Sequence, residues 1–147
     1  MTQPPSVADS EQVVDTMISL TRLSNAHRTV IAGNDRLRLY VSLKRRGFIR
    51  LATLATCNIP RKQYSVGLIS GQNGPATIEA ALTQISPFLS DCAAIAILID
   101  SSDGGLGLKV RKKLDQMAFQ IEAGVRCHEG LVLSAYRQGL GQMERAA

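Results

Sequence analysis

A single glycine stands between an apolar run and the first turns of a predicted helix in the stretch VIAGNDRLRLYV, residues 30–41. In α/β proteins, a glycine turn at the carboxyl end of a buried strand is where the backbone can approach a nucleotide. Ser70 and Gly71 follow a second strand-like run, and Asp100 closes the most apolar run of the chain. Since the carboxyl ends of parallel strands meet at one edge of a sheet, the sequence predicts a ligand crevice there, with candidate residues Gly33, Asn34, Asp35, Ser70, Gly71 and Asp100.

The charge of Asp35 restricts the ligand that this turn could hold. Free N–H groups and the helix dipole favour phosphates at a helix N-terminus, but a carboxylate in the first turn would repel them. A ligand that lacks phosphate and carries a positive charge would be compatible with Asp35 and Asp100. Both key positions also have purely structural explanations, because Gly33 could be needed for a tight turn and Asp100 could cap the helix that follows.

Other patterns for catalysis or metal binding are missing from the sequence. It contains neither a phosphate-binding P-loop nor a nucleophile elbow. His27 and His128 stand far apart without a third ligand, so we expect no metal site. Cys57 follows a strand end near two basic residues that could activate its thiol, although an inert buried thiol is favoured. The glycines at 104, 105 and 107 fit a surface connection better than a phosphate loop.

Alternating strands and helices must position these residues. Six strands are predicted at 28–33, 49–56, 64–71, 92–99, 119–126 and 129–137. Helices are predicted from Asp9 or Ser10 to about Leu23, from Asn34 or Asp35 to Gly47, from about Ala76 toward Pro87, and over 108–117. This alternation requires a mostly parallel sheet covered on both faces, whereas the short connection near His128 predicts a closing antiparallel hairpin. The fold class is therefore α/β, a single three-layer domain with a six-stranded sheet.

The order of elements over about residues 28–137 resembles that of the class I S-adenosylmethionine-dependent methyltransferases, a Rossmann-like fold that closes with such a hairpin. The resemblance implies the strand order 49–56, 28–33, 64–71, 92–99, 129–137, 119–126. It also implies S-adenosylmethionine as the cofactor, and the sulfonium and ammonium groups of this ligand suit Asp35 and Asp100.

The sequence departs from that family where the family binds its cofactor. The family has several glycines after its first strand, whereas VIAGND has only Gly33. The family's second strand ends in an acid that holds the ribose hydroxyls, whereas LATLAT ends at Thr56 and Cys57. CNIPRKQ stands where the family has a helix, a strand and a helix, so an edge of the family sheet is missing. SGQNGP is not the Asp/Asn-Pro-Pro-aromatic motif, and Ala118-Phe119 replaces the family's "GF".

The length of 147 residues and the hydrophobic content of 45% are typical of one globular domain with a substantial core. We assign residues 9–137 to this domain, and expect a disordered segment over 1–8 and a polar tail over 138–147. The apolar run 93–99 is too short to span a bilayer, and the polar start lacks the features of a signal peptide. We therefore expect a cytoplasmic protein without membrane association. The three cysteines form no CxxC pair, which predicts free, partly buried thiols.

The net charge of +5 is concentrated in two stretches. Eight Lys and Arg residues lie between Arg36 and Lys62 without an Asp or Glu, and a second stripe covers Lys109–Lys113. Such stripes could bind nucleic acid, or they could be solvated helix faces. Three functions therefore stay open: an S-adenosylmethionine-binding methyltransferase-like domain, a non-catalytic structural or interaction module that forms a homodimer, and a nucleic-acid binder. The missing glycines and the missing acid favour the second.

Overall fold

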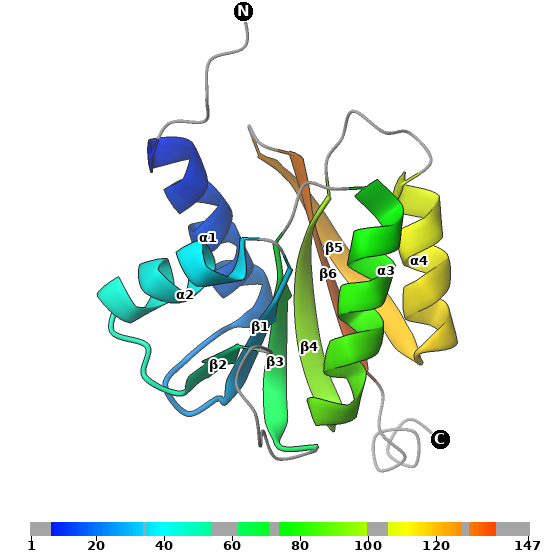
Figure 1. Cartoon of the computed structure of the whole chain (residues 1–147), viewed down its shortest axis with the longest axis horizontal. Helices are drawn as coiled ribbons and strands as arrows, with labels where there is room; N and C mark the ends of the chain where they lie inside the picture. Colours follow the sequence, from blue (N-terminus) through cyan, green and yellow to red (C-terminus); the bar gives the residue numbers. More distant parts are fainter. Residues whose placement is uncertain are drawn as a thin grey trace, which may run out of the picture.

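The computed structural model describes residues 7–33, 35–53, 62–70, 74–99, 106–127 and 130–137. Its core is a six-stranded sheet between two layers of helices (Figure 1). Helices α1 (Val7–Thr21) and α2 (Arg36–Arg45) cover one face, and α3 (Gly74–Ile85) and α4 (Leu106–Gln116) cover the other. The strands are β1 (Thr29–Ala32), β2 (Leu51–Thr53), β3 (Tyr64–Ile69), β4 (Leu89–Ile99), β5 (Phe119–Cys127) and β6 (Gly130–Arg137), and the short 3-10 helix η1 (Ser86–Phe88) precedes β4.

The strand order across the sheet is β2-β1-β3-β4-β6-β5, which confirms the predicted order. The first four strands are parallel, with Ile31 beside Leu68 and Leu68 beside Ala96. β6 returns antiparallel beside β4, and β5 pairs antiparallel with β6 at the edge. The predicted closing hairpin is therefore present, and the carboxyl ends of β1, β3 and β4 meet at one edge of the sheet.

β4 lies between β3 and β6 and supplies side chains to two separate cores. Ile95, Ile97 and Ile99 face α3 and α4, whereas Ala96 and Leu98 face α1 and α2. A strand buried on both faces needs apolar residues at every position, and this is why 93–99 reads as an uninterrupted apolar run. The helices contribute the side chains expected for their inner faces: Ile78, Ala81, Leu82 and Ile85 from α3, Val110 and Leu114 from α4, and Val13, Val14 and Met17 from α1.

Several element ends differ from the prediction. α1 begins at Val7, so Asp9 and Ser10 lie inside the helix instead of capping it. β4 begins at Leu89, three residues before the predicted start. Its first half includes the exposed residues Asp91 and Cys92, which lie in an irregular stretch where the pairing with β3 passes from Leu89 to Ala94. β2 is described only over Leu51–Thr53, and residues 54–56 of the predicted strand lie outside the described part.

The end of α2 confirms the predicted glycine stop. Gly47 has φ +94°, and its N–H donates to the Lys44 carbonyl at 3.1 Å. The N–H of Phe48 reaches back to the Leu43 carbonyl at 3.2 Å, which completes a Schellman motif. This turn directs the chain toward β2 and places Phe48 against the core beneath α1 and α2.

Candidate functional site

The turn after β1 is held against the end of β3. Gly33 has φ +104°, and a Cβ atom at this position would lie 2.1 Å from the carbonyl oxygen of Ser70. The N–H of Asp35 donates to the same Ser70 carbonyl at 3.1 Å, and the Ser70 N–H donates to the Ala32 carbonyl at 3.2 Å. No other residue type could make this turn without displacing β3. The chain's own fold therefore accounts for the glycine.

The predicted crevice residues Gly33, Asp35 and Ser70 lie together at this edge, as the strand order requires. Asn34, Gly71 and Asp100 lie outside the described residues. Asp35, one of the two residues predicted to begin α2, occupies the position just before the helix, but its side chain makes no capping hydrogen bond. Its backbone carbonyl instead accepts from the Leu39 N–H at 3.0 Å. The Asp35 carboxylate thus makes no hydrogen bond to the backbone N–H groups at the start of α2.

A small cavity of about 40 Å³ lies beside this turn. α1 closes it with Glu11, Val13 and Val14, and Asp35 and Ser70 line it from the ends of the strands. The part of this cavity that the described residues enclose has room for a few water molecules.

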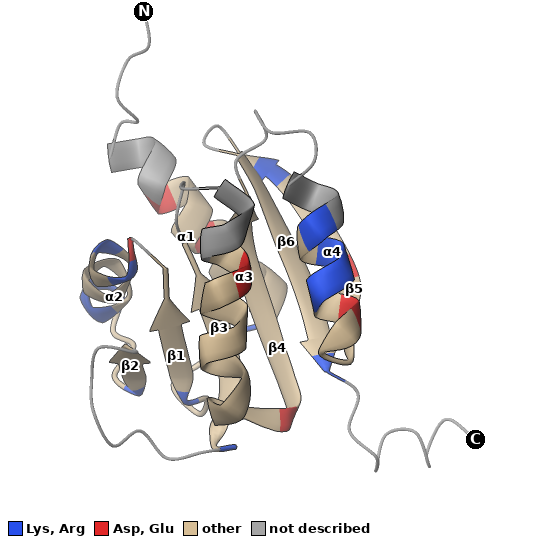
Figure 2. Ribbon diagram, turned by 45° about the vertical axis from the view of Figure 1, so that its right-hand side comes forward, with Lys and Arg blue, Asp and Glu red and all other residues tan. Residues whose placement is uncertain are grey.

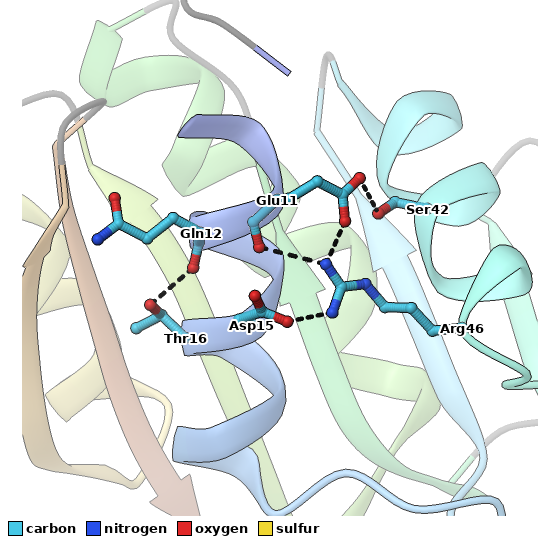
Figure 3. Close-up of polar contacts among 6 residues, drawn as sticks. All are labelled: Glu11, Gln12, Asp15, Thr16, Ser42 and Arg46. Carbon is cyan, nitrogen blue, oxygen red and sulfur yellow. Dashed lines mark hydrogen bonds and ion pairs between the residues drawn. The ribbon is translucent and has the colours of Figure 1, made fainter. Parts of the chain in front are cut away.

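Polar side chains join α1 to the end of α2, as Figure 3 shows. The guanidinium of Arg46 forms ion pairs with both Glu11 and Asp15 of α1, and it donates to the Glu11 backbone carbonyl at 3.3 Å. The Ser42 hydroxyl donates to the second carboxylate oxygen of Glu11 at 3.1 Å. The hydrogen bond from Arg46, followed by that from Ser42, holds the pKa of Glu11 below its ordinary value. These contacts fasten α1 over the cavity.

Arg46 corrects the interpretation of the first basic stripe as a uniformly solvated face. Its side chain is only 25% exposed, whereas the neighbouring Arg45 and also Arg38 are exposed. Sequence reasoning missed Glu11 and Ser42 because their partner lies more than thirty positions away. The available signal was the pair of acids Glu11 and Asp15, which stand four residues apart and so share one side of α1.

Arg46→Ala should lower the free energy of unfolding by about 1 kcal/mol, because it removes the ion pairs with Glu11 and Asp15, although Ser42 still donates to the Glu11 carboxylate. Arg45→Ala, the matched control, removes the same side chain from an exposed position and should change stability by less than about 0.5 kcal/mol. Urea titrations of both variants measure the difference. Equal effects of the two substitutions would show that the contacts in Figure 3 do not stabilise the protein.

The lowered pKa of Glu11 predicts that the effect of Arg46→Ala on stability depends on pH. Its contribution to stability is complete above the ordinary carboxyl pKa of 4.5 and is lost as the pH falls through the lower folded-state pKa. The stability difference between the native protein and Arg46→Ala should therefore narrow below about pH 4.5. A difference that stayed constant down to about pH 3 would contradict the pairing.

The remaining candidate residues form no second site in the described residues. No group of three His, Cys, Asp or Glu side chains in that part could hold a metal ion. Cys92 is exposed, which differs from the expected partial burial, and Cys127 is a half-buried free thiol. Cys57, His128, Gly104 and Gly105 lie outside the described residues, and Gly107 lies in the first turn of α4. Across the described helices, none is long and apolar enough to cross a membrane.

No family model matches the sequence, and no curated protein matches it either. The structure is nevertheless similar to solved methyltransferases. A Burkholderia thailandensis 1,6-didemethyltoxoflavin-N1-methyltransferase with bound S-adenosylhomocysteine is 14% identical over 89% of this chain and 79% of that one, with a TM-score of 0.59. A Geobacter metallireducens precorrin-6y C5,15-methyltransferase is 13% identical over 87% and 88%, with a TM-score of 0.60. A Thermotoga maritima S-adenosylmethionine-dependent O-methyltransferase is 12% identical over 94% and 68%, with a TM-score of 0.56.

Two details of the backbone agree with this likeness. The closing hairpin pairs β6 with β4, as the resemblance required. Ala118, which stands where the family has the glycine of its "GF" dipeptide, adopts φ +65°, a conformation that favours glycine. The chain therefore has the Rossmann-like fold of the class I S-adenosylmethionine-dependent methyltransferases.

Proposed function

We propose that this chain is a methyltransferase-like domain that does not transfer methyl groups and serves as a structural interaction module. The observation that carries the proposal is the contact between Gly33 and Ser70. In a cofactor-binding turn the absence of a side chain lets a ligand approach the backbone. Here the space that a side chain would occupy is filled by the backbone of β3's end.

Two further features support this proposal. The segment 51–63 contains no Asp or Glu, so the second strand is followed by no acid for the ribose hydroxyls of a nucleoside. The described cavity beside Asp35 has room for a few water molecules, and Glu11, which lines it, is already paired with Arg46 and Ser42. Both features count against adenosine binding at this edge of the sheet.

Thermal melting with four adenosine-containing ligands tests the proposal. S-adenosylmethionine, S-adenosylhomocysteine, ATP and NAD, each at about 1 mM, should leave the melting temperature within about 1 °C of the value without ligand. A ligand present at one hundred times its Kd would add about 2.7 kcal/mol and raise the melting temperature by several degrees. Such a rise with S-adenosylhomocysteine would contradict this proposal and show that the chain binds the cofactor product weakly. Asp35 favours this ligand over ATP and NAD, because it carries no phosphate.

The exposed cations favour nucleic-acid binding as a second candidate function. Lysine and arginine gather on α2 and on α4 (Figure 2). Arg38, Lys44 and Arg45 are exposed on α2, and Lys109, Arg111 and Lys112 are exposed on α4. The two helices cover opposite faces of the sheet, so they form separate basic surfaces.

The double substitution Arg38→Glu and Arg45→Glu tests the α2 surface. If this surface binds phosphate backbones, the affinity for a short DNA or RNA duplex should fall at least about tenfold at low salt, and the salt dependence should become shallower. Fluorescence anisotropy measures both. Retention of the duplex by the double variant, with the native affinity and salt slope, would exclude α2 as the contact surface.

A further inference from the structure

A groove of about 190 Å³ lies between α3 and α4, which cover the face of the sheet opposite α1 and α2. Figure 2 shows the two helices side by side, with the cations of α4 next to the acid of α3. Polar side chains of both helices line the groove: Lys109, Lys112, Lys113 and Gln116 from α4, and Glu79 from α3. The cavity at the carboxyl edge of the sheet measures only about 40 Å³ and shares none of these residues. The groove is therefore a separate concave surface.

The helical repeat gathers the cations of the groove on one side of α4. Lys109, Lys112 and Lys113 stand three or four positions apart, so their side chains are neighbours on the helix surface. Arg111 is exposed as well, but it does not line the groove. The distance along the helix axis from Lys109 to Gln116 is about 10 Å. α4 thus presents a row of lysines two turns long to the groove.

The charges of this row are unbalanced. In the part of the chain that the structure describes, none of the three lysines forms an ion pair with a carboxylate, and neither does Glu79 with a cation. Like charges three or four positions apart destabilise a helix. Three ammonium groups against one carboxylate leave two positive charges without a counterpart. Anionic groups of another molecule would relieve this repulsion.

Glu79 indicates which kind of anion fits the groove. Its carboxylate accepts hydrogen bonds and repels phosphates, which are acceptors themselves. A peptide offers both kinds of group, because its acidic side chains can pair with lysines while its backbone N–H groups can donate to a carboxylate. The described lining also contains no arginine, whose planar fork suits phosphate, and lysines act as separate point charges. The groove therefore favours an acidic peptide over a nucleic acid.

We propose that the groove between α3 and α4 docks an acidic peptide segment of a partner protein. Its carboxylates pair with Lys109, Lys112 and Lys113, and one of its backbone N–H groups donates to Glu79. The inference rests on the proposed function, because it names the chemistry of the partner that the interaction module binds. Its test does not depend on whether a nucleotide binds at the other edge of the sheet.

Fluorescence anisotropy with a labelled, glutamate-rich peptide of about twelve residues tests the groove, since this length exceeds the row of lysines. At a salt concentration of about 0.15 M, the native chain should bind the peptide with a Kd of about 100 µM or tighter. A control peptide with glutamine in place of each glutamate should bind at least about tenfold more weakly, because the lysines then have no charge to pair with.

The double substitution Lys109→Glu and Lys112→Glu should weaken binding of the acidic peptide at least about tenfold, because carboxylates then face carboxylates. Both side chains are exposed, so circular dichroism should show this variant folded. Arg50→Glu combined with Arg111→Glu is the matched control. It makes the same change of charge at two exposed arginines outside the groove and should leave the affinity within about twofold of the native value.

Three results would overturn the groove as a peptide site. One is the absence of saturable peptide binding up to about 1 mM. Another is an equal loss of affinity in both double variants, which would reveal unspecific attraction to a basic protein. The third is a short DNA duplex that displaces the peptide and binds more tightly through the same lysines, which would make the groove a phosphate site. Binding of S-adenosylhomocysteine by a chain that also binds the peptide would contradict the proposed function alone. A chain that binds neither ligand would contradict this inference alone.

Discussion

Gly33→Ala should reduce the free energy of unfolding by about 3–5 kcal/mol and lower the melting temperature by roughly 10 °C. Two costs add at this position. The residue has φ +104°, where side chains are strained, and the new methyl group would lie 2.1 Å from the Ser70 carbonyl oxygen. The obstacle is backbone at the end of β3, so relief requires a shift of the strand or of the turn. Chemical denaturation of the purified variant measures the loss.

Gly47→Ala is the matched control because it shares the backbone strain without the contact. Gly47 has φ +94°, and an added Cβ would meet no atom within 4 Å. The substitution Gly47→Ala should lower the free energy of unfolding by about 1–2 kcal/mol. The difference between the two variants therefore measures the contact with Ser70. Equal costs at both glycines would mean that the turn relaxes freely. The cofactor explanation of Gly33 would then regain its support.

Ile97→Ala should cost about 2–5 kcal/mol, through lost transfer energy and an incompletely collapsed cavity. Ile97 is fully buried in the middle of β4, beside Ile69 of β3 and Leu133 of β6. Strands on both sides and the helices α3 and α4 above it leave little room for the structure to close around the missing atoms. A urea titration gives the free energy directly.

Ile49→Ala makes the same substitution at a side chain that is 67% exposed and should cost less than about 0.5 kcal/mol. A cost below about 1 kcal/mol at Ile97 would contradict the central place of β4 in the sheet. The comparison separates burial from any general effect of replacing isoleucine by alanine.

The strand order was predictable because it depends on local signals. The uninterrupted apolar run 93–99 indicated a strand buried on both faces, and the short connection near His128 indicated a hairpin. The glycine at 47, followed by an apolar residue, marked the end of α2 in the same way. Each of these signals lies within about ten residues of the feature that it predicts.

The candidate site was predictable only in its position. That Gly33, Asp35 and Ser70 meet follows from parallel strands that end at one edge. That the Ser70 backbone occupies the space beside Gly33 depends on an approach of a few ångströms between segments 37 positions apart, and no sequence pattern encodes it. The pairing of Arg46 with Glu11 likewise depends on how α1 crosses α2. Arg46, which the sequence placed in a solvated stripe, therefore holds α1 against α2.

Isothermal titration of the purified chain with S-adenosylhomocysteine tests the central proposal most directly, since it measures occupancy of the crevice without requiring a methyl acceptor. The proposal predicts no saturable heat up to about 1 mM ligand, which corresponds to a binding free energy weaker than about −4 kcal/mol. One-to-one binding with a Kd of about 100 µM or tighter would contradict it, and would show that the turn at Gly33 still holds a nucleoside.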